Sequence, residues 1–255
     1  MKKTIRAFAQ SLNIEYTGFT QTQDGQTAIV FLFPYFWKHY PESNLSIYTY
    51  GTDYHQVIHQ YLSRIADFLN QKFPGHYYRP YADISPYDER QLAVQAGLGV
   101  LGKNHLLINE TYGSFVFIGI LVTNLPLSPD SPSCGSCIGC DKCLASCPTG
   151  ALKDGDFSRC LSHITQKKGA LTPEEEALVK EGGLVFGCDQ CQLCCPHNLR
   201  SKTPIPEFQT HQPECLHILD LLDLSNREFQ RKYNNRAFSW RGKNVLIRNL
   251  TILGQ

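Results

Sequence analysis

The sequence predicts an α+β protein in which an α/β region precedes a compact cysteine-rich module and a short helical tail. Two continuous apolar runs of strand length lie in the first half, among segments with helical spacing. Ten of the 11 cysteines lie between Cys134 and Cys195. The tail from Ile218 to Gln255 has a helical pattern. We place the domain boundaries at residues 1–127, 128–202 and 203–255.

The elements of the first region follow from its apolar pattern. The first residues predict a helix with one apolar face, formed by Ile5, Phe8, Ala9 and Leu12. After it, Ile14 leads almost directly to a buried strand over Thr27–Phe33. Thr52 and Asp53 can cap a long helix, whose apolar positions recur at helical spacing. Those positions are Val57, Tyr61, Leu62, Ile65, Phe68 and Leu69.

Two further elements and a connector complete this region. Asp88–Gln95 is expected to be a helix that stops at the glycines 97 and 99, and Phe115–Val122 is expected to be a second strand. The residues 124–133 hold three prolines and three serines, which is typical of a connector. Later in the chain, Thr172 with Pro173 and Glu175 predicts the start of another helix through a capping box.

The composition bears on the cellular location of the protein but does not identify its partners. The 255 residues include 24 Lys and Arg and 23 Asp and Glu, so a nucleic-acid surface would have to be local. The longest apolar stretch, Ser114–Leu127, is too short to span a bilayer, and the first residues lack the apolar run of a signal peptide. We therefore expect a soluble cytoplasmic protein without a membrane partner.

The cysteine module has the spacing of a ferredoxin-like protein with two 4Fe–4S clusters. Cys137, Cys140, Cys143 and Cys147, followed by Pro148, form the run CxxCxxCxxxCP. In such a run three thiolates hold one cluster and the fourth serves its neighbour. Structural zinc is the alternative, but zinc sites usually take four ligands in two pairs. Clustered cysteines in a chain without a signal peptide favour metal over disulfides.

The second run leaves one ligand open. Cys188, Cys191 and Cys195, before Pro196, repeat the ending of the first run without a regularly spaced fourth thiol. Either Cys160 or Cys194 must supply it. Cys134 and Cys194 also form extra CxxC and CC pairs, so their ligand roles stay open. Cys215 lies outside both runs and is expected to be an ordinary buried thiol.

Several stretches together resemble the epoxyqueuosine reductase family, which completes queuosine biosynthesis in tRNA. They cover most of residues 50–198, and their combination is more specific than any one of them. The matching stretches are YGTDYH at 50–55, DISPYDER at 83–90, AGLGVLGKN at 96–104, the first cysteine run through TGAL at 149–152, and GCDQCQ at 187–192 with the Cys195-Pro196 ending.

The resemblance implies an oxidoreductase that reduces epoxyqueuosine in tRNA to queuosine. It implies a cobalamin-binding α/β domain, with electrons passing through the two clusters to cobalamin and Asp83 as the proton donor. It further implies two sets of cluster ligands. Cluster one would lie on Cys137, Cys140, Cys143 and Cys195, and cluster two on Cys147, Cys160, Cys188 and Cys191. A low-potential donor such as ferredoxin or flavodoxin would supply the electrons.

Each candidate site residue also has a structural interpretation. Asp83 could be a turn or helix-capping aspartate before Pro86, whereas a general acid needs a raised pKa of the kind that burial gives. Candidate cofactor contacts are Gly97, Gly99, Lys103 and Asn104, where glycine permits close backbone approach. The two glycines could equally end a helix and form a turn. His55, at a helix start, is interpreted as structural.

The C-terminal tail departs from many members of that family. It stops after what resembles the first helix of a HEAT-type repeat, over Ser239–Gly254, and a single repeat must pack on the main body. The tail is locally basic, which predicts either a tRNA phosphate surface or a solvated helix face. Its cations are Arg227, Arg231, Lys232, Arg236, Arg241, Lys243 and Arg248.

Two other functions fit parts of the pattern. One is a corrinoid and iron–sulfur reductase of a small molecule, similar to a reductive dehalogenase, which would need no tRNA surface. The other is a non-catalytic electron carrier with two clusters, for which neither the α/β half nor Asp83 would be needed.

Overall fold

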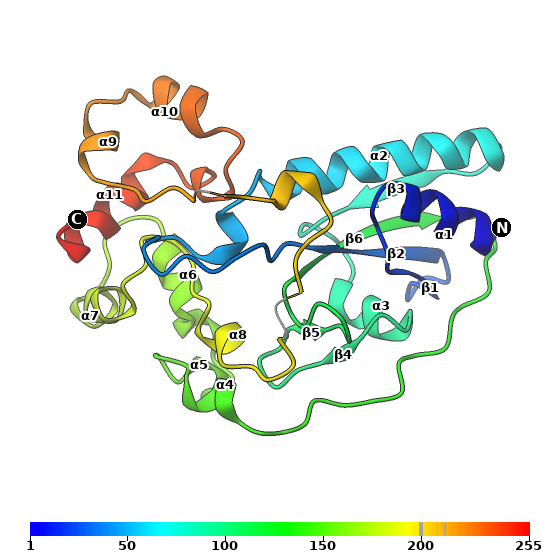
Figure 1. Cartoon of the computed structure of the whole chain (residues 1–255), viewed down its shortest axis with the longest axis horizontal. Coiled ribbons are helices and arrows are strands. Elements are labelled where there is room, and N and C mark those ends of the chain that lie inside the picture. Colours follow the sequence, from blue (N-terminus) through cyan, green and yellow to red (C-terminus); the bar gives the residue numbers. More distant parts are fainter. Residues whose placement is uncertain (199–200, 212) are drawn as a thin grey trace. The chain divides into compact units, whose positions relative to one another are not determined.

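The structure is a computed structural model that describes residues 1–198, 201–211 and 213–255, and it confirms the predicted α+β class (Figure 1). The chain forms two compact units, each assembled from segments far apart in the sequence. The first unit combines residues 1–37, 54–139 and 197–209, and the second combines 38–53, 140–196 and 210–255. The division at residues 127 and 202 stays a prediction.

The first unit is built on a four-stranded antiparallel sheet in the order β1-β2-β6-β3. Both predicted strands are confirmed as its central pair, β2 (Thr27–Pro34) and β6 (Val116–Thr123). The edge strands β1 (Thr17–Gln21) and β3 (Tyr78–Tyr81) were not predicted. Both are short, and β3 carries Pro80, which a strand tolerates at a sheet edge.

Helices cover opposite faces of this sheet, as Figure 1 shows. α3 (Glu89–Gln95) packs on the face that carries Ala28, Val30 and Leu32. The long helix α2 (Tyr54–Lys72) packs on β6 and β3, and a Cβ at Gly119 would lie 2.8 Å from the Ile58 side chain. The two strands at the centre are therefore buried on both faces, which explains their unbroken apolar sequence.

The first helix, α1 (Lys2–Ser11), attaches to α2 by its predicted apolar face. The rings of Phe8 and Phe68 stack with their centroids 3.9 Å apart. Lys2 and Arg6 form ion pairs with Asp130 at 2.5 and 2.6 Å. The connector around Asp130 is thereby tied to the sheet, because the Asp130 carboxylate also accepts a hydrogen bond from the Phe19 backbone N–H.

The second unit is a set of short helices around a small core. That core contains Leu161, Ile164, Leu171 and Val179. The helices of the cysteine segment are α4 (Lys142–Ala145), α5 (Ala151–Asp154), α6 (Leu161–Gln166), α7 (Pro173–Gly182) and α8 (Gln190–Leu193). Single 3₁₀ turns occupy Ile47–Thr49 and Phe157–Arg159 in this unit and Pro206–Phe208 in the first.

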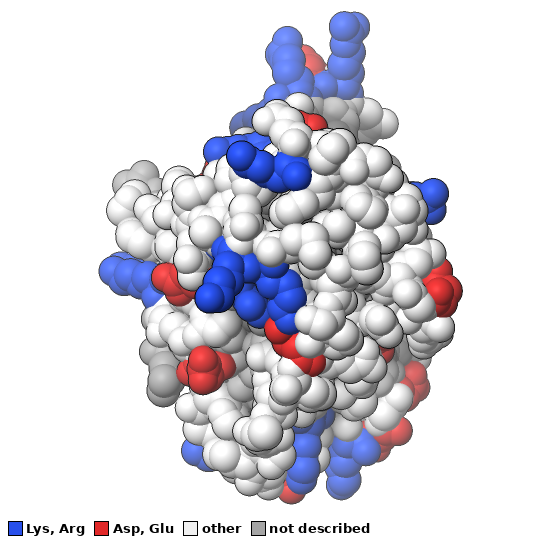
Figure 2. Space-filling view, turned by 90° about the vertical axis from the view of Figure 1, so that its right-hand side faces the viewer, with Lys and Arg blue, Asp and Glu red and all other residues white. Residues whose placement is uncertain are grey.

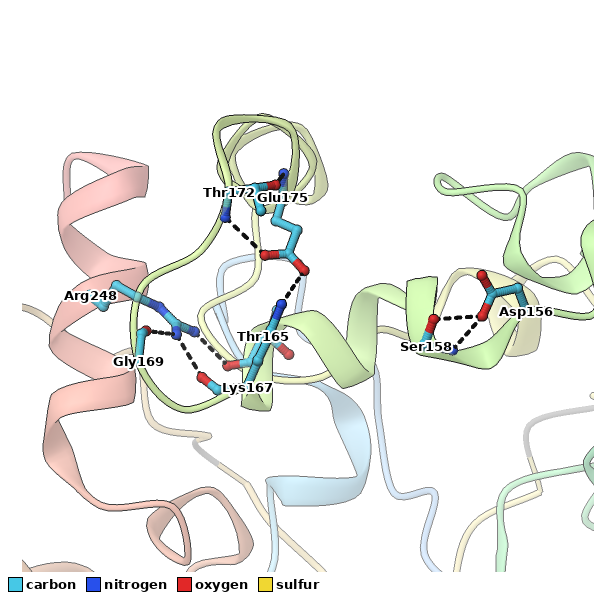
Figure 3. Close-up of polar contacts among 8 residues, drawn as sticks. All are labelled: Asp156, Ser158, Thr165, Lys167, Gly169, Thr172, Glu175 and Arg248. Atoms are coloured by element: carbon cyan, nitrogen blue, oxygen red, sulfur yellow. Dashed lines mark hydrogen bonds and ion pairs between the residues drawn. The ribbon is translucent and has the colours of Figure 1, made fainter.

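The predicted capping box at the start of α7 is confirmed. Thr172 Oγ1 accepts from the Glu175 backbone N–H at 3.3 Å, and Glu175 Oε2 accepts from the Thr172 backbone N–H at 2.9 Å. Lys167 Nζ also reaches Glu175 at 2.7 Å (Figure 3). The N-terminus of α7 is thus closed by its own side chains, which satisfies two backbone donors.

The tail forms several separate helices. They are α9 (Leu219–Leu222), α10 (Asn226–Tyr233), the turn Ala237–Ser239 and α11 (Lys243–Leu253). α11 packs on α6 and α7, as expected for a lone repeat helix. Asn249 in α11 is buried and donates to the carbonyl oxygens of Thr165 and Val185, each at 2.7 Å.

Arg248 of α11 fastens the connection between α6 and α7. Its guanidinium donates to the carbonyl oxygens of Lys167 at 2.6 Å and Gly169 at 2.7 Å (Figure 3). These contacts satisfy carbonyl groups of a connection that forms no regular structure of its own. Within the described ranges, no helix has both the length and the apolar composition required to cross a membrane.

Candidate functional site

Asp83 lies on the short connection between β3 and α3. Its backbone has φ of +64°, a left-handed conformation that is uncommon outside glycine, although aspartate adopts it more readily than most residues. Such strain persists only where neighbouring groups hold it, and it is concentrated at functional sites. The next residue, Ile84, is 85% exposed, so this turn stands out from the surface.

A histidine from α2 meets Asp83 although the two residues are far apart in sequence. His55 Nε2 lies 3.1 Å from Asp83 Oδ2, and Tyr54 stacks on both His55 and Phe117. The hydrogen bond with His55 is the main reason that the pKa of Asp83 is lowered, with burial opposing it. The interpretation of His55 as structural therefore missed its contact with Asp83, which no local pattern indicates.

The environment of Asp83 differs from the one expected for a general acid. Its side chain is 56% exposed in the pair with His55, and its pKa is lowered instead of raised. A carboxyl in this setting is ionised at neutral pH in the chain without ligands. Any role as a proton donor then depends on a neighbour or a ligand that supplies the proton.

Asp83 opens onto a cleft of about 570 Å³ in the first unit. One wall is apolar and is formed by residues 116–118 of β6 with the ring of Tyr54. The opposite wall carries four charged side chains in a short stretch of sequence, which are Asp83, Asp88, Glu89 and Arg90. The cleft therefore joins a flat aromatic surface to a cluster of carboxyl groups.

Glu89 is the residue of this cleft that the sequence analysis overlooked. Its Oε2 accepts a hydrogen bond from the Asp83 backbone N–H at 3.3 Å. Burial raises the pKa of Glu89 to about 7, helped by the negative charges of Asp83 and Asp88 and opposed by the hydrogen bond from the Asp83 N–H and by Arg90. The available signal was an acid in the first turn of a helix directly after the DxxP turn, which alone suggests only helix capping.

The candidate glycines support backbone structure in this unit. Gly97 has φ of +76° and ends α3, with its N–H donating to Val94 and the Leu98 N–H donating to Ala93, a Schellman motif. A Cβ at Gly99 would lie 2.4 Å from the Ile108 carbonyl oxygen. These contacts account for both glycines without a cofactor, and their role as contacts stays a prediction.

Lys103 and Asn104 lie in the turn between β4 (Val100–Leu101) and β5 (Leu107–Ile108). Lys103 is exposed, whereas Asn104 is buried and its Oδ1 accepts from the Leu106 backbone N–H at 3.3 Å. Asn104 therefore shapes this hairpin. A cofactor contact from either side chain stays a prediction.

The four thiols predicted for cluster two come together in the second unit. Cys188 is influenced electrostatically by Cys160 and Cys147, and Cys191 by Cys188, Cys160 and Cys194. Burial raises the pKa of Cys188 to about 11 and raises that of Cys191 as well. Buried thiols that raise one another's pKa are relieved when they bind metal as thiolates, so this set fits a cluster.

Local turns position Cys160 near Cys188 and Cys191. Asp156 caps the 3₁₀ turn before it, accepting from the Ser158 N–H at 3.1 Å and the Ser158 hydroxyl at 2.6 Å (Figure 3). Cys160 then starts α6 as its N-cap residue. Of the two thiols that the sequence left open, Cys160 lies near both Cys188 and Cys191, and Cys194 lies near Cys191.

The predicted ligands of cluster one have less structural support. Cys143 in α4 is buried, and α4 packs against α8, which Cys195 closely follows. Cys137 belongs to the first unit, so its set stays a prediction. Within the described chain, no group of three His, Cys, Asp or Glu is placed to hold a single metal ion. A 4Fe–4S cluster does not need such a group, because each of its irons takes one thiolate.

One thiol prediction is wrong. Cys215 is exposed, not buried. It lies in the stretch before α9, where Asn44 accepts from the backbone N–H of Leu216 at 2.9 Å and Leu216 takes the buried position. Leu216, the next residue in sequence, therefore occupies the interior, and Cys215 lies at the surface.

Three of the seven tail cations are used within the chain. Arg248 holds the connection before α7, Lys243 donates to the carbonyl of Leu222 at 3.4 Å, and Arg236 pairs with Glu214 at 3.1 Å. Arg227, Arg231 and Lys232 are exposed, and Arg241 lies over the ring of Trp240 at 3.7 Å. On the face that Figure 2 draws, Lys and Arg lie in separate groups.

Two family models match separate parts of the chain. The model for epoxyqueuosine reductase QueG matches residues 19–84, which include the sheet's first strands, α2 and Asp83. The model for a 4Fe–4S double cluster binding domain matches residues 136–198. The second match ends after Cys195 and covers all eight predicted cluster ligands.

Curated epoxyqueuosine reductases are similar over most of the chain. The protein from Lactococcus garvieae is 38% identical over 217 residues, which are 83% of this chain and 61% of that protein. The protein from Bacillus subtilis is 37% identical over 206 residues, 79% of this chain and 53% of its own length. The chain spans about half to three fifths of the curated relatives that it matches.

Solved structures give the same likeness over almost the whole chain. The epoxyqueuosine reductase of Streptococcus thermophilus aligns with a TM-score of 0.84 and 28% identity, covering 99% of this chain and 80% of that one. A second, in complex with an epoxyqueuosine-modified tRNA-Tyr stem loop, aligns with a TM-score of 0.86 and 30% identity at the same coverage. In a Bacillus subtilis structure with a TM-score of 0.84, the catalytic aspartate loop is swung out of the active site.

Proposed function

The chain belongs to the epoxyqueuosine reductase family, and we propose that it reduces epoxyqueuosine in tRNA to queuosine with Asp83 as a proton donor. The observation that carries the proposal is the strained turn of Asp83 facing His55 at the edge of a cleft. A strained acidic residue of this kind is expected where a site must present one carboxyl to a substrate. The related structure with a modified tRNA stem loop supports the choice of substrate.

The thiols of the second unit support a role in electron supply. Cys147, Cys160, Cys188 and Cys191 would hold one 4Fe–4S cluster, and Cys137, Cys140, Cys143 and Cys195 the other. The burial of Cys188 and Cys191 and their electrostatic interaction with the other cysteines of this group fit metal-bound thiolates. A low-potential protein such as a ferredoxin or flavodoxin would be the external donor.

The cleft of the first unit suits the flat ring of a cobalamin. Phe117 and Tyr54 stack with their centroids 4.2 Å apart and line it together with two aliphatic side chains of β6. When bound, cobalamin would supply the electron-rich centre that reduction of an epoxide carbon requires. The predicted cofactor contacts Gly97, Gly99, Lys103 and Asn104 are not among the residues that line this cleft, and their contact with cobalamin stays a prediction.

The chain's own residues then have defined tasks. His55 holds the carboxyl of Asp83 toward the cleft, and Glu89 holds its backbone N–H. Asp83 would deliver one of the two protons that the substrate oxygen must take up, together with two electrons from the external donor, before it leaves as water and the alkene forms. The apolar wall of β6 excludes water from one side of the site, which strengthens these polar contacts.

The test is anaerobic conversion of the modified tRNA. Protein with reconstituted clusters would be incubated with epoxyqueuosine tRNA, cobalamin and a low-potential reductant, and the nucleosides would be resolved by mass spectrometry. We expect queuosine to form only when all components are present. Absence of queuosine from an otherwise loaded protein would refute the proposed function.

A small-molecule substrate is the second candidate, because three of the tail cations that could contact tRNA phosphates already bind within the chain. The two candidates differ in their response to salt. Binding to tRNA should weaken steeply as salt rises, since phosphate contacts release counterions. A protein that turns over a small epoxide and shows no tRNA binding would favour the second candidate.

A further inference from the structure

We propose that Glu89 is the second proton source of this site, holding one proton while the pair of Asp83 and His55 provides the other. The inference rests on the proposed function, since it concerns the same cleft and the same substrate. It adds a residue that neither the motif nor the resemblance identified as part of the chemistry.

The stoichiometry of the reaction requires two protons. Converting an epoxide to an alkene breaks both carbon–oxygen bonds, forms the second carbon–carbon bond and releases the oxygen as water. The balance is one epoxide, two electrons and two protons on one side, and one alkene and one water on the other. A low-potential one-electron donor supplies the electrons in two steps. One carboxyl can release one proton in a turnover, so Asp83 alone is insufficient.

Glu89 lies where a second proton is needed. It begins α3, lines the same cleft as Asp83, and accepts from the Asp83 backbone N–H through Oε2 at 3.3 Å. Its other oxygen, Oε1, is buried and has no hydrogen-bond partner within the described part of the chain. An ionised carboxylate with one buried, unpaired oxygen is costly, whereas the neutral acid carries a proton that no group of the described chain accepts.

The charges around Glu89 agree with this assignment. Asp83 and Asp88 disfavour its ionisation and Arg90 favours it, while His55 and Tyr54 lie beside Asp83 and residues 116–118 of β6 are apolar. Burial raises the pKa of Glu89 to about 7, whereas His55 lowers that of Asp83. Two nearby carboxyls with opposite shifts have different roles, one holding its proton and one ionised.

A pair of substitutions separates the two tasks of Glu89. Glu89→Gln retains an oxygen that can accept from the Asp83 N–H but has no acid proton, whereas Glu89→Ala removes both. We expect Glu89→Gln to lower kcat at pH 7 by about 10- to 100-fold, within the range of general acid catalysis, with little change in KM. Glu89→Ala should in addition raise KM. Glu176→Gln, on an exposed position of α7, is the matched control and should keep wild-type kinetics.

The pH profile identifies proton supply specifically. In the wild type, kcat should fall as pH rises through the pKa of Glu89, which is about 7. This decrease in kcat should be missing in Glu89→Gln. A Glu89→Gln protein with wild-type kcat and an unchanged decrease would overturn the proposal. If the wild type itself forms no queuosine, the proposed function fails instead, and the kinetic experiment distinguishes the two failures.

A measurement that needs no turnover decides the protonation state. Infrared spectra of the protein without substrate should contain a protonated carboxyl band that disappears as pH rises from 6 to 8. Glu89→Gln should lack the part of the band that titrates near pH 7 and keep the part due to buried Asp189, whose pKa burial raises to about 6, whereas Glu176→Gln should keep both. A wild-type spectrum in which every carboxyl has already ionised below pH 5 would refute Glu89 as a proton store, whatever the substrate proves to be.

Discussion

The turn of Asp83 and the connection before α7 are both short links to a helix, but different groups hold them. The connection before α7 is fixed by Arg248, whose guanidinium keeps its charge, and by a capping box (Figure 3). The turn of Asp83 is fixed by His55 and by Glu89, whose pKa burial raises to about 7. The comparison teaches that a structural link uses permanent contacts, whereas a reactive link uses groups that can exchange protons.

Substitution of Asp83 should have the largest effect on the reactive link and is therefore the strongest test of how it differs from the structural link. We expect Asp83→Asn to lower kcat by about 10²- to 10⁴-fold, because an amide cannot donate an acidic proton. Clusters and cobalamin should still bind, as seen in the absorption spectrum. Asp67→Asn, on an exposed position of α2, is the control. Unchanged turnover in Asp83→Asn would eliminate Asp83 as a proton donor.

Removing Arg248 tests the structural link instead. Arg248→Met leaves the carbonyl groups of Lys167 and Gly169 without their donor, which should lower the free energy of unfolding by about 2 kcal/mol. Anaerobic urea unfolding measures this loss, with Arg231→Met on exposed α10 as the control. Turnover by the folded protein should stay within about twofold of the wild type. A Met variant as stable as the wild type would show that these contacts contribute little.

Glu89 gives the reactive link a pH dependence near pH 7, whereas Glu175 of the structural link, whose pKa Lys167 and the Thr172 N–H lower, titrates only in acid. Its folded pKa is raised, so the folded state binds its proton more tightly than the unfolded chain does. Stability should therefore fall as pH rises from about 4.5 to 7, by 1 to 3 kcal/mol at most. Glu89→Gln should remove this decrease when unfolding is measured at pH 5 and pH 8. An equal decrease in both proteins would assign it to other groups.

The smallest expected effect comes from His55. Its hydrogen bond lowers the pKa of Asp83, so the contribution of Asp83 to stability is present above its ordinary pKa and is lost as pH falls through the lowered one. His55→Gln should move the titration of Asp83 upward toward its ordinary value. Carbon NMR of the Asp83 carboxyl, assigned by comparison with Asp83→Asn, measures the shift. An unchanged pKa of Asp83 in His55→Gln would show that His55 does not lower it.

Structural features that depend on residues close together in the sequence were predictable. The strands β2 and β6, the helices α2 and α3 and the capping box at Thr172 all follow from periodicity and capping rules. The edge strands were missed because β1 and β3 are short and the latter contains proline. The tail was expected to be helical, but its division into separate helices was not foreseen.

The candidate site was predictable only in part. A turn at Asp83 follows from Pro86 after it, and the left-handed backbone of Asp83 does not. The cysteine spacing indicated two clusters but left Cys160 and Cys194 as alternatives, and the structure places Cys160 near both Cys188 and Cys191. The contact of Asp83 with His55 joins residues 28 positions apart, which no local spacing encodes.

By itself, the sequence determined the mixed fold class, the central strands, the cysteine runs and the family resemblance, because each depends on residue types at short, fixed spacings. Only the tertiary structure decided which carboxyl has a raised pKa and which a lowered one. The pKa of Asp83 and that of Glu89 are set by burial and by charges from other elements. Such an environment forms only when α2, β6 and the turn before α3 come together around one cleft.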